Sequence, residues 1–467
     1  MSGNEMTNDE LPEGWINCHL GDAIGYMRNG MVAKQTKDGA GLPISRIETI
    51  AAGTIDPNRI GFSNDVSAKN AETYRLKSDD ILFSHINSPS HLGKTAIYEG
   101  YPETLYHGMN LLMLQAREGL ATPRFLEASL RFLRVSGTFS LVAQHAVNQA
   151  SINQKKLSEL QIPLAPLAEQ KRIADKLEAV LGRVDACRAR LDRVPALLKR
   201  FRQSVLAAAT SGKLTEEWRM TNGVNDGWEK VPLEDTIDGI EQGWSPKCEN
   251  EPSTDPADWA VIKTTAIQEM AFLDYENKRL PKHLKPRPNL EIQPGDILIT
   301  RAGPRVRAAV TCMVDSVRPR LIVCDKVYRF RARKGKTTPN YLNVFLNSPL
   351  IVQELDEMKT GISDSGVNLT QSKFRALQIP LPPLAEQQEI VRRVEALFAF
   401  ADRIEARLAT AQKTVERLTP ATLAKAFRGE LVPQDPNDEP ARVLLEQLKT
   451  IESAPSSKAK RRQTTCP

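Results

Sequence analysis

The stretch QIPLAPLAEQ at residues 161–170 returns almost unchanged as QIPLPPLAEQ at residues 378–387. Nine of the ten positions are identical, at an offset of 217 residues. The same offset aligns further pairs: Gln154 with Gln371, Leu160 with Leu377, Glu178 with Glu395, Leu206 with Leu423, and Gly212 with Gly429. An offset that persists in this way indicates an internal repeat. The chain is therefore a duplication, and its two copies share one scaffold.

After each LAEQ, apolar residues recur at alternating spacings of four and three, which is the pattern of a heptad seam. The predicted seam residues are Ile173, Leu177, Val180, Val184, Leu191, Ile390, Val394, Leu397, Ile404 and Leu408. Two helices of the same period can bury their seams on each other, so we expect an intramolecular antiparallel coiled coil. Packing of the two helices against other chains is the alternative.

Prolines and glycines predict the limits of these helices. The prolines just before each LAEQ favour a sharp helix start, because proline fits the first turn but not the interior. Pro195 and Pro420 predict that each long helix breaks or kinks before a shorter helix, at 196–209 and 421–428. Gly212 and Gly429 are expected to end them.

The residues before each helix contain short β-rich runs punctuated by Gly, Pro, Asn and Asp. DDILF at 79–83 resembles GDILI at 295–299, so the copies match here too, although more weakly. The predicted fold class is α+β, with two tandem globules separated by two long helices that form an antiparallel coiled coil. The predicted domains are globules at 1–160 and 220–377, helical spacers at 161–219 and 378–434, and a polar, basic-ended tail at 435–467.

Charge is distributed unevenly over the 467 residues, which carry a formal net charge of +6. Between Lys278 and Lys336 there are 16 Lys and Arg against four acids. Such a block attracts phosphate, although a solvated loop face is the alternative. From Arg75 to Arg134 the first globule has seven basic residues against six acids, and so lacks an equivalent block. The two globules therefore differ in how much phosphate contact their own charge predicts.

The sequence gives no sign of export, of a membrane span or of a metal site. The N-terminus is polar and acidic, so we expect a cytoplasmic protein. No stretch approaches the 18 or more apolar residues of a membrane span. The six cysteines are far apart, without CxxC or histidines at ligand spacing, so ordinary thiols are expected.

Catalytic motifs are also missing. The strings NSPS at 87–90 and NSPL at 347–350 lack the second proline and the aromatic residue of a methyltransferase signature. SPSHLGKT at 88–95 resembles a phosphate-binding loop, but Ser88 replaces its first glycine. His85, His91 and His107 match no metal or nuclease spacing, and the second copy has Arg301 in place of His85. We therefore expect no catalytic residues and no bound metal.

In order and in duplicate, these features resemble the specificity subunit of type I restriction–modification enzymes. The residues that carry the resemblance are GW near the start of each copy, the DDIL and GDIL strands, the QIP-L-x-PLAEQ helix entry, RFRQSVLAAATSGKLTEEWR at 200–219 and AKAFRGELVPQ at 424–434. The resemblance implies that each globule is a target-recognition domain that reads one half of a split, asymmetric DNA sequence.

The resemblance also implies partners. The helices would carry two methyltransferase subunits, and motor–nuclease subunits would join for restriction. S-adenosylmethionine, ATP and Mg²⁺ would bind to those partners and not to this chain. A stand-alone DNA-binding regulator is the main alternative, and a coiled-coil adaptor that binds no DNA is a third.

Base reading requires donors and acceptors on loops that reach the major groove. The predicted DNA-binding residues of the first globule are Arg46, His85, Asn87, Ser88, His91 and Lys94. Those of the second are Gln242, Trp244, Ser245, Lys247, Arg301, Arg305 and Arg307, of which the three arginines are the strongest candidates. Simple exposure is the alternative for each of them.

The helices also suggest a spacing. The seam from Ile173 to Leu198 covers about 40 Å at 1.5 Å per residue, which is close to the roughly 34 Å of one B-DNA turn. This length predicts two short half-sites separated by a fixed gap. The basic cluster in the tail, Lys458, Lys460, Arg461 and Arg462, is expected to be a disordered, solvated end.

Overall fold

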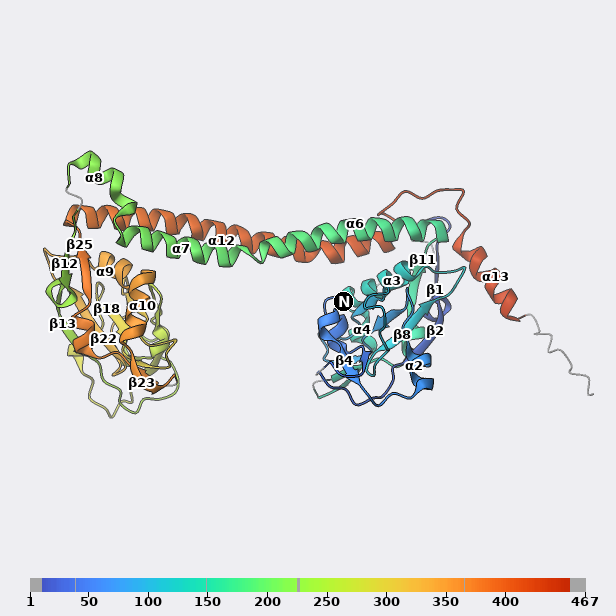
Figure 1. The fold of residues 1–467 in the computed structure, drawn as a ribbon, viewed down its shortest axis with the longest axis horizontal. Coiled ribbons are helices and arrows are strands. Elements are labelled where there is room, and N and C mark those ends of the chain that lie inside the picture. Colours follow the sequence, from blue (N-terminus) through green and yellow to red (C-terminus); the bar gives the residue numbers. More distant parts are fainter. Residues whose placement is uncertain (1–10, 38, 148, 225–226, 365, 454–467) are drawn as a thin grey trace, which may run out of the picture. The chain divides into compact units, whose positions relative to one another are not determined.

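The computed structural model describes residues 11–453, except for residues 38, 148, 225–226 and 365. The chain divides into two compact units. Unit 1 takes Met1–Leu191 and Ala411–Pro467, and unit 2 takes Asp192–Thr410. Each unit consists of a globule and the helices that pack on it (Figure 1). The division falls within the long helix α12 (Leu384–Phe427), so each unit includes part of that helix.

A four-stranded antiparallel sheet forms the centre of the globule in unit 1. In spatial order its strands are β2 (Ile24–Asn29), β8 (Leu112–Ala116), β5 (Ile81–Phe83) and β7 (Thr95–Ile97). Successive side chains of a strand point to opposite faces. Ile81 and Phe83 accordingly join the core beneath α3 (Pro123–Val135), while Leu82 joins a separate cluster on the other face. Burial on both faces explains why ILF is continuously apolar.

Unit 2 repeats this sheet. Its strands in the same order are β13 (Ile237–Gln242), β22 (Val327–Ala332), β18 (Ile297–Thr300) and β20 (Thr311–Met313). Ile297 and Ile299 pack beneath α9 (Pro339–Leu346), and Leu298 joins the cluster on the opposite face. The strands predicted from DDILF and GDILI are thus confirmed as β5 and β18, at equivalent places in the two sheets.

Three-stranded sheets beside these cores are also duplicated. In unit 1 the order is β6 (Ile86–Asn87), β10 (Gln149–Ser151) and β9 (Gln144–Ala146). In unit 2 it is β19 (Ala302–Gly303), β24 (Gly366–Asn368) and β23 (Thr360–Ser363). Because β6 and β19 follow β5 and β18 closely, these small sheets support the loops in which recognition residues are predicted.

The QIPL segments are strands that close each globule. Strand β11 (Gln161–Leu164) pairs antiparallel with β1 (Ile16–His19), and β25 (Gln378–Leu381) pairs in the same way with β12 (Glu229–Pro232). The start and end of each globule are therefore neighbours. The prolines that follow place the helix starts where they were predicted, at Leu167 and Leu384.

The two predicted proline breaks have different outcomes. Helix α6 (Leu167–Leu191) ends before α7 (Val194–Thr210), which has Pro195 in its first turn, so this break is confirmed. Helix α12 continues through Pro420, so the second predicted break is wrong. An interior proline costs about 3 kcal/mol. The residues beyond it offset that cost by burial, since Leu423, Ala426 and Phe427 are fully buried in the core of unit 1.

The helices pair antiparallel within unit 2. Arg202 of α7 bonds to Asp402 and Glu405 of α12, while Arg219, farther along the chain, bonds to Glu386, nearer the start of α12. In unit 1 the start of α6 is bonded to the segment that follows α12, because Arg172 pairs with Asp438 at 2.5 Å.

The predicted seam residues differ in burial. The buried ones are Ile173, Leu177, Val184, Ile390, Val394 and Leu408, and the half-buried ones are Val180, Leu191, Leu397 and Ile404.

A helix, α13 (Ala441–Ser453), lies in the segment for which a polar tail was predicted. Its side chains Ala441 and Leu445 are buried in the core of unit 1. The prediction missed this helix because its mean composition is polar and only one narrow face is apolar. The basic cluster from Lys458 to Arg462 lies outside the described residues.

Candidate nucleic-acid interface

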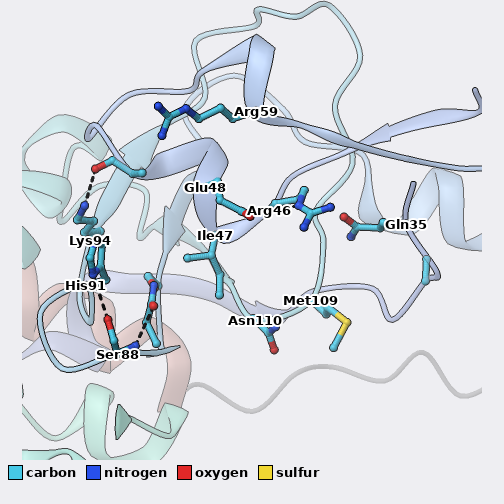
Figure 2. Close-up of a pocket in the computed structure, with 14 residues that line it drawn as sticks. Gln35, Arg46, Ile47, Glu48, Arg59, Ser88, His91, Lys94, Met109 and Asn110 are labelled. Carbon is cyan, nitrogen blue, oxygen red and sulfur yellow. Dashed lines mark hydrogen bonds and ion pairs between the residues drawn. The ribbon is translucent and has the colours of Figure 1, made fainter. Parts of the chain in front are cut away.

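A cavity of about 750 Å³ opens in the globule of unit 1 (Figure 2). It lies between the 3-10 turn η2 (Ile47–Ile50) and the loop from β5 to β7. Five of the six DNA-binding residues predicted for this globule line it: Arg46, Asn87, Ser88, His91 and Lys94. Sequence reasoning missed other polar residues of the lining, namely Gln35, Glu48, Arg59 and Asn110. The structure thus brings together residues from segments far apart in the sequence.

The loop of this cavity holds its own polar side chains. Asn87 donates from Nδ2 to Ser84 Oγ at 3.1 Å and accepts from the Ser88 backbone N–H at 2.8 Å. The His91 ring Nδ1 lies 3.0 Å from Ser88 Oγ and 2.9 Å from Ser90 Oγ. These contacts orient the loop before any ligand binds.

Arg46 and Lys94 lie at opposite ends of η2, since Arg46 precedes it and Lys94 bonds to the residue that follows it. Lys94 Nζ donates to the Ala51 carbonyl at 2.6 Å, and burial lowers the pKa of its ammonium. Arg46 Nε donates to Glu48 Oε2 at 3.1 Å. Burial by itself would raise the pKa of Glu48, but hydrogen bonds from the backbone and from Arg46 lower it overall. Glu48 is therefore a carboxylate at neutral pH.

His85 is the sixth predicted residue, and it does not line the cavity. It follows strand β5, and its carbonyl accepts from the Ile152 N–H at 2.9 Å. Burial lowers the pKa of its imidazole to about 4, so the ring is neutral at physiological pH. Its Nδ1 is buried and has no hydrogen-bond partner among the residues that the structure describes.

The three arginines predicted as the strongest candidates occupy different environments in unit 2. Arg307 is half-buried, and its Nη2 donates to the carbonyls of Thr264 and Ile267, both at 2.7 Å. Arg305 forms ion pairs with Asp356 at 2.9 Å and Asp364 at 3.0 Å. The Arg307 guanidinium thus ties two loops together.

Arg301 and the loop after β13 meet at Asp325. Arg301 Nε donates to the Asp325 carbonyl at 2.8 Å, and Ser245 donates to the Asp325 carboxylate. Trp244 is half-buried beneath the Arg287 guanidinium, which lies 4.4 Å from the ring centroid. Gln242 and Lys247 are exposed. Base contact by these residues stays a prediction, but Arg301 and Ser245 both form hydrogen bonds to Asp325.

Many arginines of the basic block of unit 2, residues 278–336, make hydrogen bonds within the unit itself. Several of its arginines donate to backbone carbonyls of other loops: Arg318 to Asp258, Arg320 to Ala257, Arg329 to Glu291 and Asn289, and Arg333 to Asp235 and Ile237. A guanidinium has five fixed donors, which suits it to join segments in this way. Much of the charge imbalance between the globules therefore reflects how the loops of unit 2 are cross-linked.

Sequence reasoning also missed the reason why GW and LAEQ recur together. Trp15 Nε1 donates to the buried carboxylate of Glu169 at 3.0 Å, and Trp228 Nε1 donates to Glu386 at 2.9 Å. The neighbouring glutamine of each LAEQ receives the backbone N–H of the residue that caps α3 or α9, Thr122 or Thr338. The signal was present in the sequence, because LAEQ and the GW at the start of each copy both recur.

Other chemistries find little support in the part of the chain that the structure describes. Within the described ranges no group of three His, Cys, Asp or Glu residues could hold a metal ion. No helix there is long and apolar enough to cross a membrane. Burial raises the pKa of the Cys18 and Cys312 thiols to about 12, so these thiols are protonated at neutral pH.

In a comparison with known proteins, both copies match the same family. Residues 12–195 and 225–412 each match the family described as the type I restriction modification DNA specificity domain. The chain is 30% identical to the EcoKI specificity subunit of Escherichia coli, over 97% of this chain and 98% of that protein. It is 32% identical to the putative MjaX specificity subunit of Methanocaldococcus jannaschii, over 83% of this chain and 88% of that protein.

Solved structures agree on the fold. A chain from a study of complex assembly and conformational transition of the type I R-M system gives a TM-score of 0.67 at 20% identity. It covers 90% of this chain and 99% of its own length. The HsdS subunit from Thermoanaerobacter tengcongensis gives a TM-score of 0.56 at 20% identity, with 92% and 100% covered.

Proposed function

The chain belongs to the type I restriction–modification DNA specificity family, and from this premise we propose how its two globules divide the recognition of DNA. It is the sequence-specificity subunit of such a system, and the catalytic activities reside in partner subunits. We propose that each globule reads one short half of a split target, with the helices fixing the gap between the halves. The relatives are specificity subunits of type I restriction enzymes, which does not fit the alternative of a stand-alone regulator.

The observation that carries the proposal is the contrast between frame and loops. By the frame we mean the elements that close each globule, which are the Trp–Glu hydrogen bond and the paired QIPL strand. Both copies have them. The loops after β5 and β18 differ, because the first borders a cavity and the second is bonded through Arg307 to the segment of Thr264 and Ile267. Equal frames with unequal loops favour a target whose halves differ in sequence.

The chain assembles with DNA and with other subunits of its system. We propose two methyltransferase subunits for each copy of this chain, one for each half of the duplicated frame, and motor–nuclease subunits that join for restriction. S-adenosylmethionine, ATP and Mg²⁺ would bind to those partners. The complex would work in the cytoplasm, where the host DNA is.

Two measurements test this function together. Mapping methylated adenines in a host that expresses the system, with and without this chain, should give one split motif that disappears without it. Co-purification of the full chain should recover methyltransferase subunits at two per chain. Sequence-specific DNA binding by the chain without any enzyme partner, and with no change in methylation, would instead favour the regulator.

A further inference from the structure

At the place in unit 2 that corresponds to the cavity of unit 1, one arginine bridges to a neighbouring loop. Arg307 lies four residues before β20, and His91 lies four residues before β7, at the same point of the repeated sheet. Arg307 reaches across to the carbonyls of Thr264 and Ile267. The shorter His91 turns to its own loop, and the space in front of η2 stays open.

The polar groups that face this cavity differ in how many hydrogen bonds they already make within the protein. Lys94, Asn87 and His91 are engaged with their own protein neighbours. Arg46 uses Nε for Glu48, while no hydrogen bond from its two Nη groups is found within the described residues. Those two nitrogens form the end of the guanidinium fork, which matches two adjacent acceptors. Figure 2 shows Arg46 between Glu48 and Gln35 at the cavity.

The backbone beneath Arg46 is fixed. The Arg46 N–H donates to Thr49 Oγ at 2.8 Å, and that buried hydroxyl donates to the Arg59 carbonyl at 2.6 Å. Gly61 leaves room for the side chains above it, since a Cβ there would lie 2.3 Å from Gln35 Oε1 and 3.1 Å from Arg46 Cδ. An arginine held in this way loses little conformational freedom when it binds.

Glu48 decides between the two kinds of acceptor that DNA offers. A phosphate would meet a carboxylate beside the arginine, and like charges at this distance repel. The edge of a G·C pair has no such conflict, because guanine offers O6 and N7 as acceptors and the cytosine amino group is a donor. The Glu48 oxygen that Arg46 does not use can accept from that amino group.

We propose that Arg46 and Glu48 together read one G·C base pair in the half-site bound by unit 1. Arg46 donates from both Nη atoms to guanine, and Glu48 both orients the arginine and accepts from the cytosine amino group. The proposal rests on the proposed function, that this globule reads DNA in the major groove. The proposal names the two cavity residues that would set the preference for a base, as distinct from residues that only raise the affinity for any DNA.

The test is binding selection from randomised DNA with the complete modification complex, which contains the full chain. The wild-type complex should select a split motif with guanine at one position of one half-site. Arg46→Lys keeps the charge but loses the fork, so we expect the preference for that guanine to fall on the order of 10- to 100-fold. Glu48→Gln should weaken the same position alone. The other half-site should not change in either variant.

The control is Arg59→Ala, because Arg59 also lines the cavity but is exposed and pairs with Asp56 at 3.3 Å. It should leave the base preferences unchanged. A uniform loss of affinity for all sequences in Arg46→Ala, with no change at any base and full binding by Arg46→Lys, would overturn the proposal and make Arg46 a phosphate contact. Failure of the wild-type complex to select any split motif would instead count against the proposed function itself.

Discussion

Glu169 and Glu386 occupy the same position in the two copies but have different partners. Both are buried, and each accepts the indole N–H of its tryptophan. Glu386 also bonds to the buried guanidinium of Arg219 at 2.7 Å, whereas Glu169 receives the neutral amide of Gln434 at 3.3 Å. Burial raises the pKa of Glu169 accordingly. Glu386 therefore has a direct ion pair with Arg219, whereas Glu169 is held by hydrogen bonds and also interacts electrostatically with Arg172.

Matched glutamine variants should separate these two cases. Glu386→Gln removes the buried ion pair with Arg219, so we expect unit 2 to lose about 3–5 kcal/mol of unfolding free energy. Glu169→Gln removes no ion pair, and a loss of about 1 kcal/mol is expected. Hydrogen exchange of the β25 and β11 amides measures each unit by itself. Equal losses in the two units would contradict the assignment.

Glu169 also predicts a pH dependence. Its folded-state pKa is raised above that of an exposed carboxyl, so the folded state binds the proton more tightly than the unfolded state. Unit 1 should therefore lose stability as the pH rises through that folded pKa. The slope should disappear in Glu169→Gln. Denaturant unfolding followed at several pH values checks this, and a slope that persists in the variant would assign it to another group.

Arg301 is the arginine of the predicted trio whose surroundings best fit recognition. Its Nε is held by the Asp325 carbonyl, and its guanidinium lies 5.7 Å from the Tyr328 ring centroid. Arg301→Ala should relax or abolish recognition of one half-site, by on the order of 10-fold or more. Selection from randomised DNA measures this, with the exposed Lys334→Ala as control. Equal loss at both half-sites would count against two independent readers.

The sequence predicted which candidate residues of the first globule lie together better than it predicted the contacts that each candidate makes. Five of the residues chosen in the first globule do share one cavity, because four of them lie on the loop from β5 to β7 and Arg46 directly precedes η2. The role of Arg307 could not be predicted, since its acceptors Thr264 and Ile267 lie far from it in sequence. Local patterns contain no information about such pairings.

At the scale of elements, the limits of α12 and α13 show where local rules fail. The helix starts and the break at Pro195 follow from proline alone, and both were predictable. Helix α12 continues past Pro420 because Phe427 at its end packs against Phe125 and Phe132 of α3, with centroids 5.4 and 4.8 Å apart. Burial against a distant segment outweighs a local preference, and a single sequence does not reveal that partner.

Helix α13 gives a test at this scale. Leu445 is 7% exposed and belongs to the core of unit 1, while Val443 on the same helix is 37% exposed. Leu445→Ala should cost about 2–5 kcal/mol of unfolding free energy, and Val443→Ala should cost little. Thermal unfolding of both variants would compare them. If the two lose the same amount, α13 does not form part of the core.

At the scale of the whole molecule, the paired helices are predicted to fix the gap in the DNA target. Adding seven residues to α12 within 385–418, matched by seven in α6 or α7, keeps the seam in phase. We expect this change to lengthen the gap between half-sites without altering either one. Methylation mapping reads both properties at once. A four-residue insertion in one helix breaks the phase and serves as control, and an unchanged gap in the seven-residue variant would refute the prediction.

The division of the chain into units also sets an order of events during synthesis. Unit 2 is one continuous segment, whereas the core of unit 1 needs Leu423, Ala426 and Phe427 from the far end of α12. At 5–20 residues per second, the ribosome takes roughly 10–50 s to travel from Leu191 to Phe427. During that time the nascent unit 1 leaves apolar surface uncovered, and unit 2 is complete at Thr410, before Phe427 is added. Chaperone binding to the emerging chain should therefore concentrate on unit 1.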